Sequence, residues 1–348
     1  MVCHMMKGRG VWQLALTYIG AVVGAGFASG QEILYFFAIY GIPGLWGALL
    51  AGLGFAFFGG LVYQLSRRHR IRAYHDFLQL ILGRRLGRIA DCWLMAYLFG
   101  SLVIMLAGCR AIFQQHLELP GTIGLVVSLL IVFGTLFYRE EGVIAVNWLL
   151  VPAMICGILL VTLGTDPLAG GEAGFAVPAG ERNFPGWALS SLLYVSYNLL
   201  GGLVVLVSLS RVPGSFSMGG PVGGGLGLGC LVFLITAFLQ GRWETIEGVE
   251  LPLLFFAGKS SWHLGIFYAL VLWFAMLTSA VAVLLGLVIR FRHYSFLSEK
   301  ELTLIFLFLA SVFSTFGFSA LVRTVYPFFG YLGLLILLGL LRRSWIEK

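Results

Sequence analysis

The chain has 348 residues, of which 59% are hydrophobic and only 11% are charged, and its mean hydropathy is +0.96. Because about a quarter of the residues in a soluble domain are charged, these values exclude a cytosolic enzyme, a nucleic-acid-binding protein and a disordered chain. The formal net charge of +7 fits a membrane protein whose basic residues flank apolar segments. We therefore expect an all-α polytopic membrane protein with no nucleic-acid partner.

Apolar runs of about 20 residues are long enough to cross a bilayer as helices. Ten such runs follow one another along the chain, so both ends of the chain should lie on the same side of the membrane. The predicted spans are residues 13–37, 43–65, 89–115, 122–138, 143–164, 187–210, 222–240, 263–289, 302–318 and 325–341. Three longer connections separate them, at residues 66–88, 165–186 and 241–262.

The basic residues are distributed unequally between the two sides of these spans. With the N-terminus inside, 17 of the 22 Lys and Arg residues fall in inner segments and 4 in outer segments. Since basic residues concentrate in cytoplasmic loops, we expect both termini in the cytoplasm. The segment 67–88 holds seven arginines, and we expect it to form an interfacial amphipathic helix beside anionic lipid.

Only two of the charged residues fall inside the predicted spans, Glu32 and Arg110. At 1.5 Å per helical residue, Glu32 lies about 10 Å and Arg110 about 12 Å from the middle of its span, both toward the outside. Because charges within membranes are costly and are usually paired or functional, we expect a Glu32–Arg110 ion pair that acts as an external gate. Two alternatives remain. Arg110 extends to the outer interface, or Glu32 carries a coupling proton, since burial favours its protonated form.

Glycines are concentrated in the first span, where Gly20, Gly24, Gly26 and Gly30 fall within eleven residues. Such a cluster favours an unwound helix that exposes backbone groups to a solute or an ion. The alternative is a continuous helix that uses its small residues for close packing.

The sixth span carries Ser196, Tyr197 and Asn198 near its middle, followed by a pair of glycines. Spans one and six occupy corresponding positions if the chain consists of two five-helix halves. Interrupted helices at corresponding positions indicate a transporter site. We therefore predict an inverted repeat of residues 1–164 and 187–348, joined by an extracellular loop at 165–186, with helices 1 and 6 broken.

Three sequence segments resemble the YkvI family of bacterial membrane proteins. They are GAGFASGQE at residues 24–32, LYVSYN at 193–198 and VYPFFGY at 325–331, and the resemblance extends over nearly the whole chain. The family is similar to a branch of the amino acid–polyamine–organocation superfamily, whose members share the LeuT-type 5+5 inverted repeat. The resemblance implies a secondary transporter in the bacterial cytoplasmic membrane.

The resemblance also implies a sodium site between the first and eighth spans. By position, the backbone carbonyls of Gly20, Val23 and Ala275 and the hydroxyls of Thr278 and Ser279 would bind the ion. A hard cation requires such oxygen ligands. The alternative is that the two hydroxyls bond to carbonyls of their own helix.

The solute is expected at the two helix breaks. The candidate binding residues are Gly24, Ala25 and Gly26 in the first span and Ser196, Tyr197 and Asn198 in the sixth.

The leading hypothesis is sodium-coupled symport of an amino acid or a similar small organic solute. The alternatives are a transporter-fold sensor that binds ligand without flux, and a proton-coupled transporter that uses Glu32. An enzyme with its own cofactor is not expected, since no span contains paired carboxylates, a Ser/His pair or metal-ligand spacing.

The charge distribution makes a testable prediction about orientation. Green fluorescent protein fused after Lys348 should fluoresce, and alkaline phosphatase inserted within residues 165–186 should be active, because the first folds in the cytoplasm and the second outside it. The two reporters exchanged between these sites serve as controls. The opposite pattern of activities would overturn the predicted orientation.

Overall fold

The computed structural model describes residues 11–71, 73–135, 141–164, 185–210, 218–292 and 295–347, apart from the side chains of Ala25 and residues 141–148. Within these residues all regular secondary structure is helical, which confirms the predicted all-α class. The helices are α2 (Val11–Val22), α3 (Ala25–Ser29), α4 (Gln31–Phe36), η1 (Ala38–Tyr40), α5 (Ile42–Arg68), α6 (Tyr74–Gln115), α7 (Gly121–Thr135), α8 (Glu141–Gly164), α9 (Trp187–Leu209), α10 (Gly219–Leu239), α11 (Trp243–Ile246), α12 (Pro252–Ser260), α13 (Trp262–Arg292), α14 (Glu299–Phe313), η4 (Ser314–Phe316) and α15 (Phe318–Ile346).

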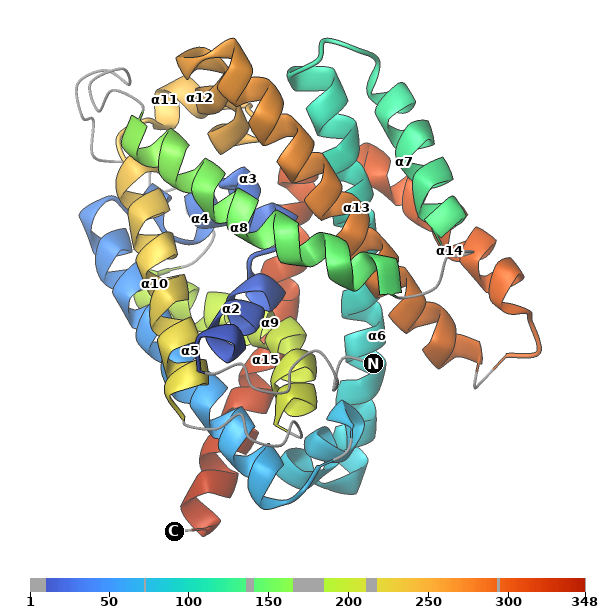
Figure 1. Ribbon diagram of the computed structural model, residues 1–348. Helices are drawn as coiled ribbons and strands as arrows, with labels where there is room; N and C mark the ends of the chain where they lie inside the picture. Colours follow the sequence, from blue (N-terminus) through green and yellow to red (C-terminus); the bar gives the residue numbers. More distant parts are fainter. Residues whose placement is uncertain are drawn as a thin grey trace.

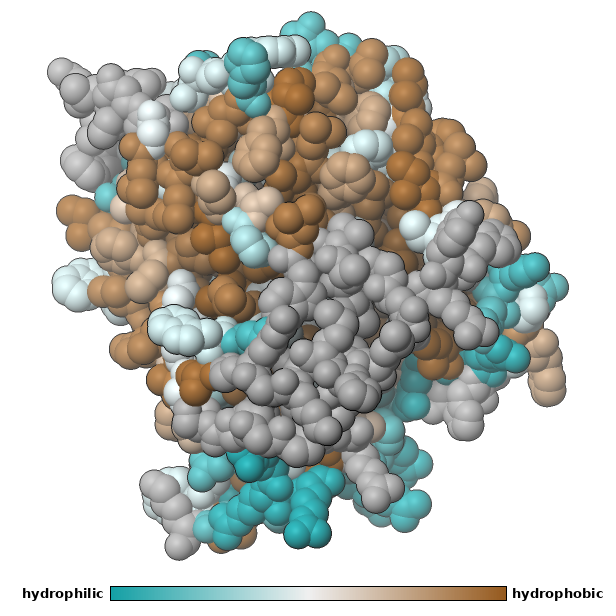
Figure 2. All heavy atoms as spheres, viewed as in Figure 1, coloured by the Kyte–Doolittle hydropathy of each residue, from teal (hydrophilic) through white to brown (hydrophobic). Residues whose placement is uncertain are grey.

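Six of the described helices are long and apolar enough to cross a membrane: α5, α6, α9, α10, α13 and α15. Figure 2 shows apolar side chains over the upper and left parts of the visible face, with hydrophilic side chains at the top and more of them at the lower end, which holds the C-terminus in Figure 1. The remaining predicted spans correspond to the interrupted segment α2–α4, the 15-residue helices α7 and α14, and α8. The membrane architecture is therefore confirmed, while the count of ten spans and the inverted repeat stay predictions.

Several of the predicted connections are wholly or partly helical in the structure, including residues 241–262, which contain α11 and α12. Within residues 66–88, α5 continues to Arg68 and α6 begins at Tyr74, so the predicted interfacial helix is joined to the third span across a kink at Gly83 (φ 79°, ψ 169°). The last helix, α15, begins at Phe318 rather than near residue 325, because Gly317 takes a left-handed φ of 86° and caps it. Most of the predicted extracellular loop, residues 165–184, lies outside the described residues.

The predicted break in the sixth span is wrong, since α9 is one continuous helix over Trp187–Leu209. The side chains of Ser196 and Asn198 find hydrogen-bond partners without unwinding. The Ser196 hydroxyl lies 2.6 Å from the Gly330 carbonyl of α15, and the Asn198 amide donates to the Tyr194 carbonyl one turn earlier at 3.0 Å. Helical backbone hydrogen bonds are therefore kept, and the polar groups link α9 to its neighbour or to itself.

Helices α5 and α10 lie side by side (Figure 1) and approach closely through glycines. A Cβ atom added at Gly52 would lie 2.7 Å from the Gly229 Cα atom, and one added at Gly225 would lie 2.3 Å from the Ala56 backbone nitrogen. Because the obstructing atoms belong to the backbone, no side-chain rotation can relieve such contacts. The small residues are therefore required for this crossing.

Ion pairs join helices near the end that holds the C-terminus. Asp91 of α6 pairs with Arg290 of α13. Glu347, which follows α15, pairs with His69 at 2.7 Å and with Arg68 at 3.3 Å, both at the end of α5. These contacts hold α6 to α13 and α5 to α15 at this end of the molecule.

The α5–α10 crossing predicts different effects for two glycines of the same helix. Gly225→Ala should lower the free energy of unfolding by about 1–3 kcal/mol, because the two backbones must separate to admit the methyl group. Gly223→Ala should be neutral or slightly stabilising, since nothing lies within 4 Å of its added Cβ. Thermal unfolding of the two purified variants measures the difference, and equal melting temperatures would contradict the predicted close crossing.

Candidate functional site

The first span is broken, as predicted. Helix α2 ends at Val22 and α3 begins at Ala25. Between them Gly24 is extended (φ −89°, ψ −175°) and donates its N–H to the Val22 carbonyl at 2.8 Å. A second change of direction follows at Gly30, whose φ of 82° separates α3 from α4. Since the terminal carbonyls and N–H groups of a helix lack intrahelical partners, the break provides backbone groups that can bind an ion or a solute.

Glu32 lies directly after this break, as the second residue of α4, and only 4% of its surface is exposed. Its carboxylate accepts a hydrogen bond from the Tyr197 hydroxyl of α9, and the Tyr326 hydroxyl of α15 also bonds to it. The carboxylate is folded back against α3, because a Cβ atom added at Gly26 would lie 1.8 Å from Glu32 Oε1. Gly26 therefore leaves the space that the carboxylate occupies.

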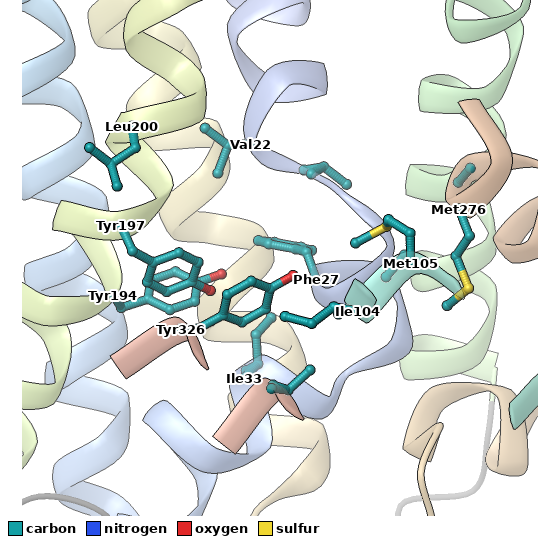
Figure 3. Close-up of a cluster of buried hydrophobic side chains, with 14 of the residues drawn as sticks. Val22, Phe27, Ile33, Ile104, Met105, Tyr194, Tyr197, Leu200, Met276 and Tyr326 are labelled. Carbon is teal, nitrogen blue, oxygen red and sulfur yellow. The ribbon is translucent and has the colours of Figure 1, made fainter. Parts of the chain in front are cut away.

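Three buried tyrosines, which we call the tyrosine cluster, surround this side of Glu32: Tyr194, Tyr197 and Tyr326. The rings of Tyr197 and Tyr326 are stacked at 4.7 Å with an interplanar angle of 9°, and Tyr194 lies edge-on to Tyr197 at 5.5 Å. Figure 3 shows the three rings gathered beside the first span, close to Phe27 and Ile33. The arrangement places phenolic hydroxyls around a carboxylate inside an otherwise apolar core.

The predicted Glu32–Arg110 ion pair is not formed. Glu32 faces α9 and α15, whereas Arg110, near the end of α6, packs against the start of α7. A Cβ atom added at Gly121 would lie 2.6 Å from Arg110 Cγ. Arg110 is half-buried and interacts electrostatically with Glu250 in the connection before α12. The two charges share a predicted depth, but they contact different helices.

Some of the predicted solute-binding residues lie at the helix break and Glu32, and the others lie beside them. Tyr197 contacts Glu32, Gly24 lies in the break, and Gly26 of α3 leaves the space that the Glu32 carboxylate occupies. Ser196 and Asn198 are used in the helix contacts of α9 described above. Ala25 begins α3, and its side chain lies outside the described residues.

The predicted sodium ligands occupy α2, the break and α13. Gly20 packs against Val151 of α8, and Val23 is buried at the break. In α13 the Thr278 hydroxyl lies 3.2 Å from the Ala275 carbonyl, which is the alternative bonding within one helix, and Ser279 is half-buried. Sodium binding stays a prediction. No group of three or more His, Cys, Asp or Glu side chains that could hold a metal ion occurs in the described part of the chain.

Sequence reasoning missed three contacts made by the first span near its break. Tyr326 bonds to Glu32 from the last helix. The Tyr268 hydroxyl of α13 donates to the Ala28 carbonyl of α3 at 2.5 Å. The Gln31 amide donates to the Ser319 hydroxyl at 2.6 Å. A lone tyrosine in an apolar run gives no signal that distinguishes a polar contact from ordinary packing.

Comparisons with known proteins agree with this architecture. No protein-family model matches the chain. The chain is 28% identical to the membrane protein YkvI of Bacillus subtilis (strain 168) over 335 residues, 94% of each chain. It is 26% identical to the protein YyaD of the same organism over 346 residues, 99% of each chain.

Two solved transporters share the fold. Inward-facing Mhp1 matches with a TM-score of 0.60 and 13% identity, covering 93% of this chain and 73% of Mhp1. The Eremococcus coleocola manganese transporter matches with a TM-score of 0.59 and 13% identity, covering 93% and 76%. Mhp1 is a nucleobase-cation-symport-1 family transporter and has been solved with bromovinylhydantoin bound. The chain therefore shares its overall fold with these transporters.

The contact between Gly26 and Glu32 predicts a difference between two neighbouring glycines. Gly26→Ala should lower the free energy of unfolding by about 1–3 kcal/mol, because the methyl group displaces the buried carboxylate from Tyr197. Gly24→Ala is the matched control, since nothing lies within 4 Å of its added Cβ. Thermal unfolding in detergent compares the two variants, and an unchanged melting temperature for Gly26→Ala would show that Glu32 is not held against α3.

Proposed function

We propose that the chain is a secondary active transporter that moves a small organic solute, such as an amino acid, across the membrane by alternating access. The solute site is the break between α2 and α3 together with Glu32 and the tyrosine cluster. The observation that carries this proposal is the buried carboxylate that faces a broken helix. The fold shared with the two solved transporters supports the proposal as well.

A permanently buried carboxylate is a costly feature for a membrane protein. In the described part of the chain Glu32 has no ion-pair partner, and its contacts are hydroxyl groups. Such a group gains from a cation or a proton that enters with the solute and leaves with it. A centre that must be occupied and then emptied suits a transport cycle better than a purely structural role.

Sodium is our first candidate for the coupling ion. The carbonyls of Gly20, Val23 and Ala275 and the hydroxyls of Thr278 and Ser279 would supply its oxygen ligands. A proton carried by Glu32 is the second candidate, and the hydrogen bonds of that carboxylate to the Tyr197 and Tyr326 hydroxyls favour it. The two candidates predict different driving gradients.

Uptake into proteoliposomes tests the proposal. The solute panel should contain amino acids and hydantoins, and the membrane potential should be held at zero. With one sodium ion per solute, a tenfold sodium gradient supplies about 1.4 kcal/mol and should accumulate the solute about tenfold. Thr278→Val with Ser279→Ala should abolish this accumulation, because the ion loses two ligands.

The same assay contains the contradicting outcomes. Accumulation driven by a pH gradient and abolished by Glu32→Gln would replace sodium with a proton. Glu244→Gln, which changes an exposed glutamate on α11, serves as the control carboxylate variant. Saturable binding without gradient-driven uptake of any panel member would contradict transport and favour a sensor.

A further inference from the structure

A cavity of about 250 Å³ lies on a different face of α4 from the tyrosine cluster. We call it the outer cavity, because it is formed by α4, α11 with the connection that follows, and the start of α15, near the end predicted to be extracellular (Figure 1). Its lining includes Gln31, Leu34, Tyr35, Trp243, Glu247 and Glu250. The volume suits a solute smaller than a drug-sized ligand.

The charged side chains that line the outer cavity are both acidic. Glu250 is half-buried, and one of its oxygens accepts the Phe318 N–H at 3.1 Å. Glu247 is exposed and belongs to none of the ion pairs in the described part of the chain. The nearby cations lie outside the lining: Arg110 acts on Glu250, and Arg323 lies over the Tyr35 ring at 5.5 Å.

Gln31 provides the second, independent sign of a ligand. This residue is 1% exposed, and its amide nitrogen donates to Ser319 at 2.6 Å. Its amide oxygen has no hydrogen-bond partner. Because buried acceptors are almost always paired, an oxygen left unpaired at a cavity wall is explained by a donor that the ligand brings.

The remaining walls are apolar and aromatic. The Trp243 ring lies edge-on to Tyr35 at 6.4 Å, and Leu34 and Phe316 complete this side. We propose that the outer cavity binds a small organic solute through a protonated amine directed at Gln31 Oε1 and the two carboxylates, with the apolar body of the solute against Trp243. An ammonium group supplies three donors and a positive charge, which matches an acceptor-lined, acidic wall.

The short helix α4 contributes to both sites, since Gln31 lines the outer cavity and the adjacent Glu32 faces the tyrosine cluster. A solute in the outer cavity would therefore occupy a site distinct from the proposed transport site. Binding in the outer cavity requires no ion gradient and no net transport, so it is measured independently of the proposed function.

Equilibrium binding to the full-length protein in nanodiscs tests the proposal. The probes are phenylalaninamide, which is cationic, and 3-phenylpropanamide, which differs only by lacking the amino group. Isothermal titration calorimetry, with empty nanodiscs as the reference, should give a dissociation constant about tenfold or more lower for the amine, as expected for a charge-assisted hydrogen bond. Equal affinities, or a preference for 3-phenylpropanamide, would overturn the proposal.

Variants locate the bound amine. Glu247→Gln changes an exposed side chain and should weaken phenylalaninamide binding about tenfold, and Gln31→Glu should strengthen it by adding a charge at the unpaired oxygen. Glu244→Gln, which alters an acidic residue of α11 outside the lining, should leave the affinity unchanged. Binding that is lost in Glu32→Gln yet unaffected by Glu247→Gln and Gln31→Glu would place the amine in the tyrosine cluster and overturn the proposal. If the protein binds phenylalaninamide but shows no gradient-driven uptake, the proposed transport is contradicted and the outer-cavity proposal is not.

Discussion

The burial of one carboxylate in an apolar core is the constraint on which the centre of this molecule depends. Glu32 is removed from water, and an isolated charge in such surroundings is costly. The chain provides hydroxyl donors from two other helices, α9 and α15, and a glycine in α3 that leaves room for the carboxylate. Helices far apart in sequence are therefore oriented around a single side chain.

Close packing makes this arrangement possible. The first span changes direction twice, at Gly24 and Gly30. The Glu32 side chain therefore lies back against α3, whereas it would lie further along the axis if the helix were straight. Around it, α5 and α10 cross at backbone distance through Gly52 and Gly229. Glycine thus serves opposite purposes in the molecule, since it breaks one helix and lets two others touch. The outer cavity follows from the same geometry, because the short helix α4 presents Gln31 to one side and Glu32 to the other.

The sequence predicts features that depend on composition along one segment, and it fails where the outcome depends on which segments meet. Clustered glycines predicted the broken first span, and the scarcity of charge identified Glu32. The same reasoning predicted a break in α9, but Ser196 and Asn198 find partners without one. The predicted depth of Arg110 matches that of Glu32, yet Arg110 packs against Gly121. The role of Tyr326 depends on how α15 packs, which no local pattern encodes.

Solute protection of a cysteine at the helix break tests the central claim most directly. Gly24→Cys, placed where an added side chain meets nothing within 4 Å, would be introduced with the native cysteines replaced by serine. Its alkylation by a membrane-permeant maleimide would be timed with and without a transported solute. If the break is the solute site, saturating solute should slow the labelling of Gly24→Cys at least about tenfold, while a control cysteine at Gly223 on α10 is labelled at an unchanged rate. Labelling at residue 24 that is indifferent to saturating solute would contradict the account.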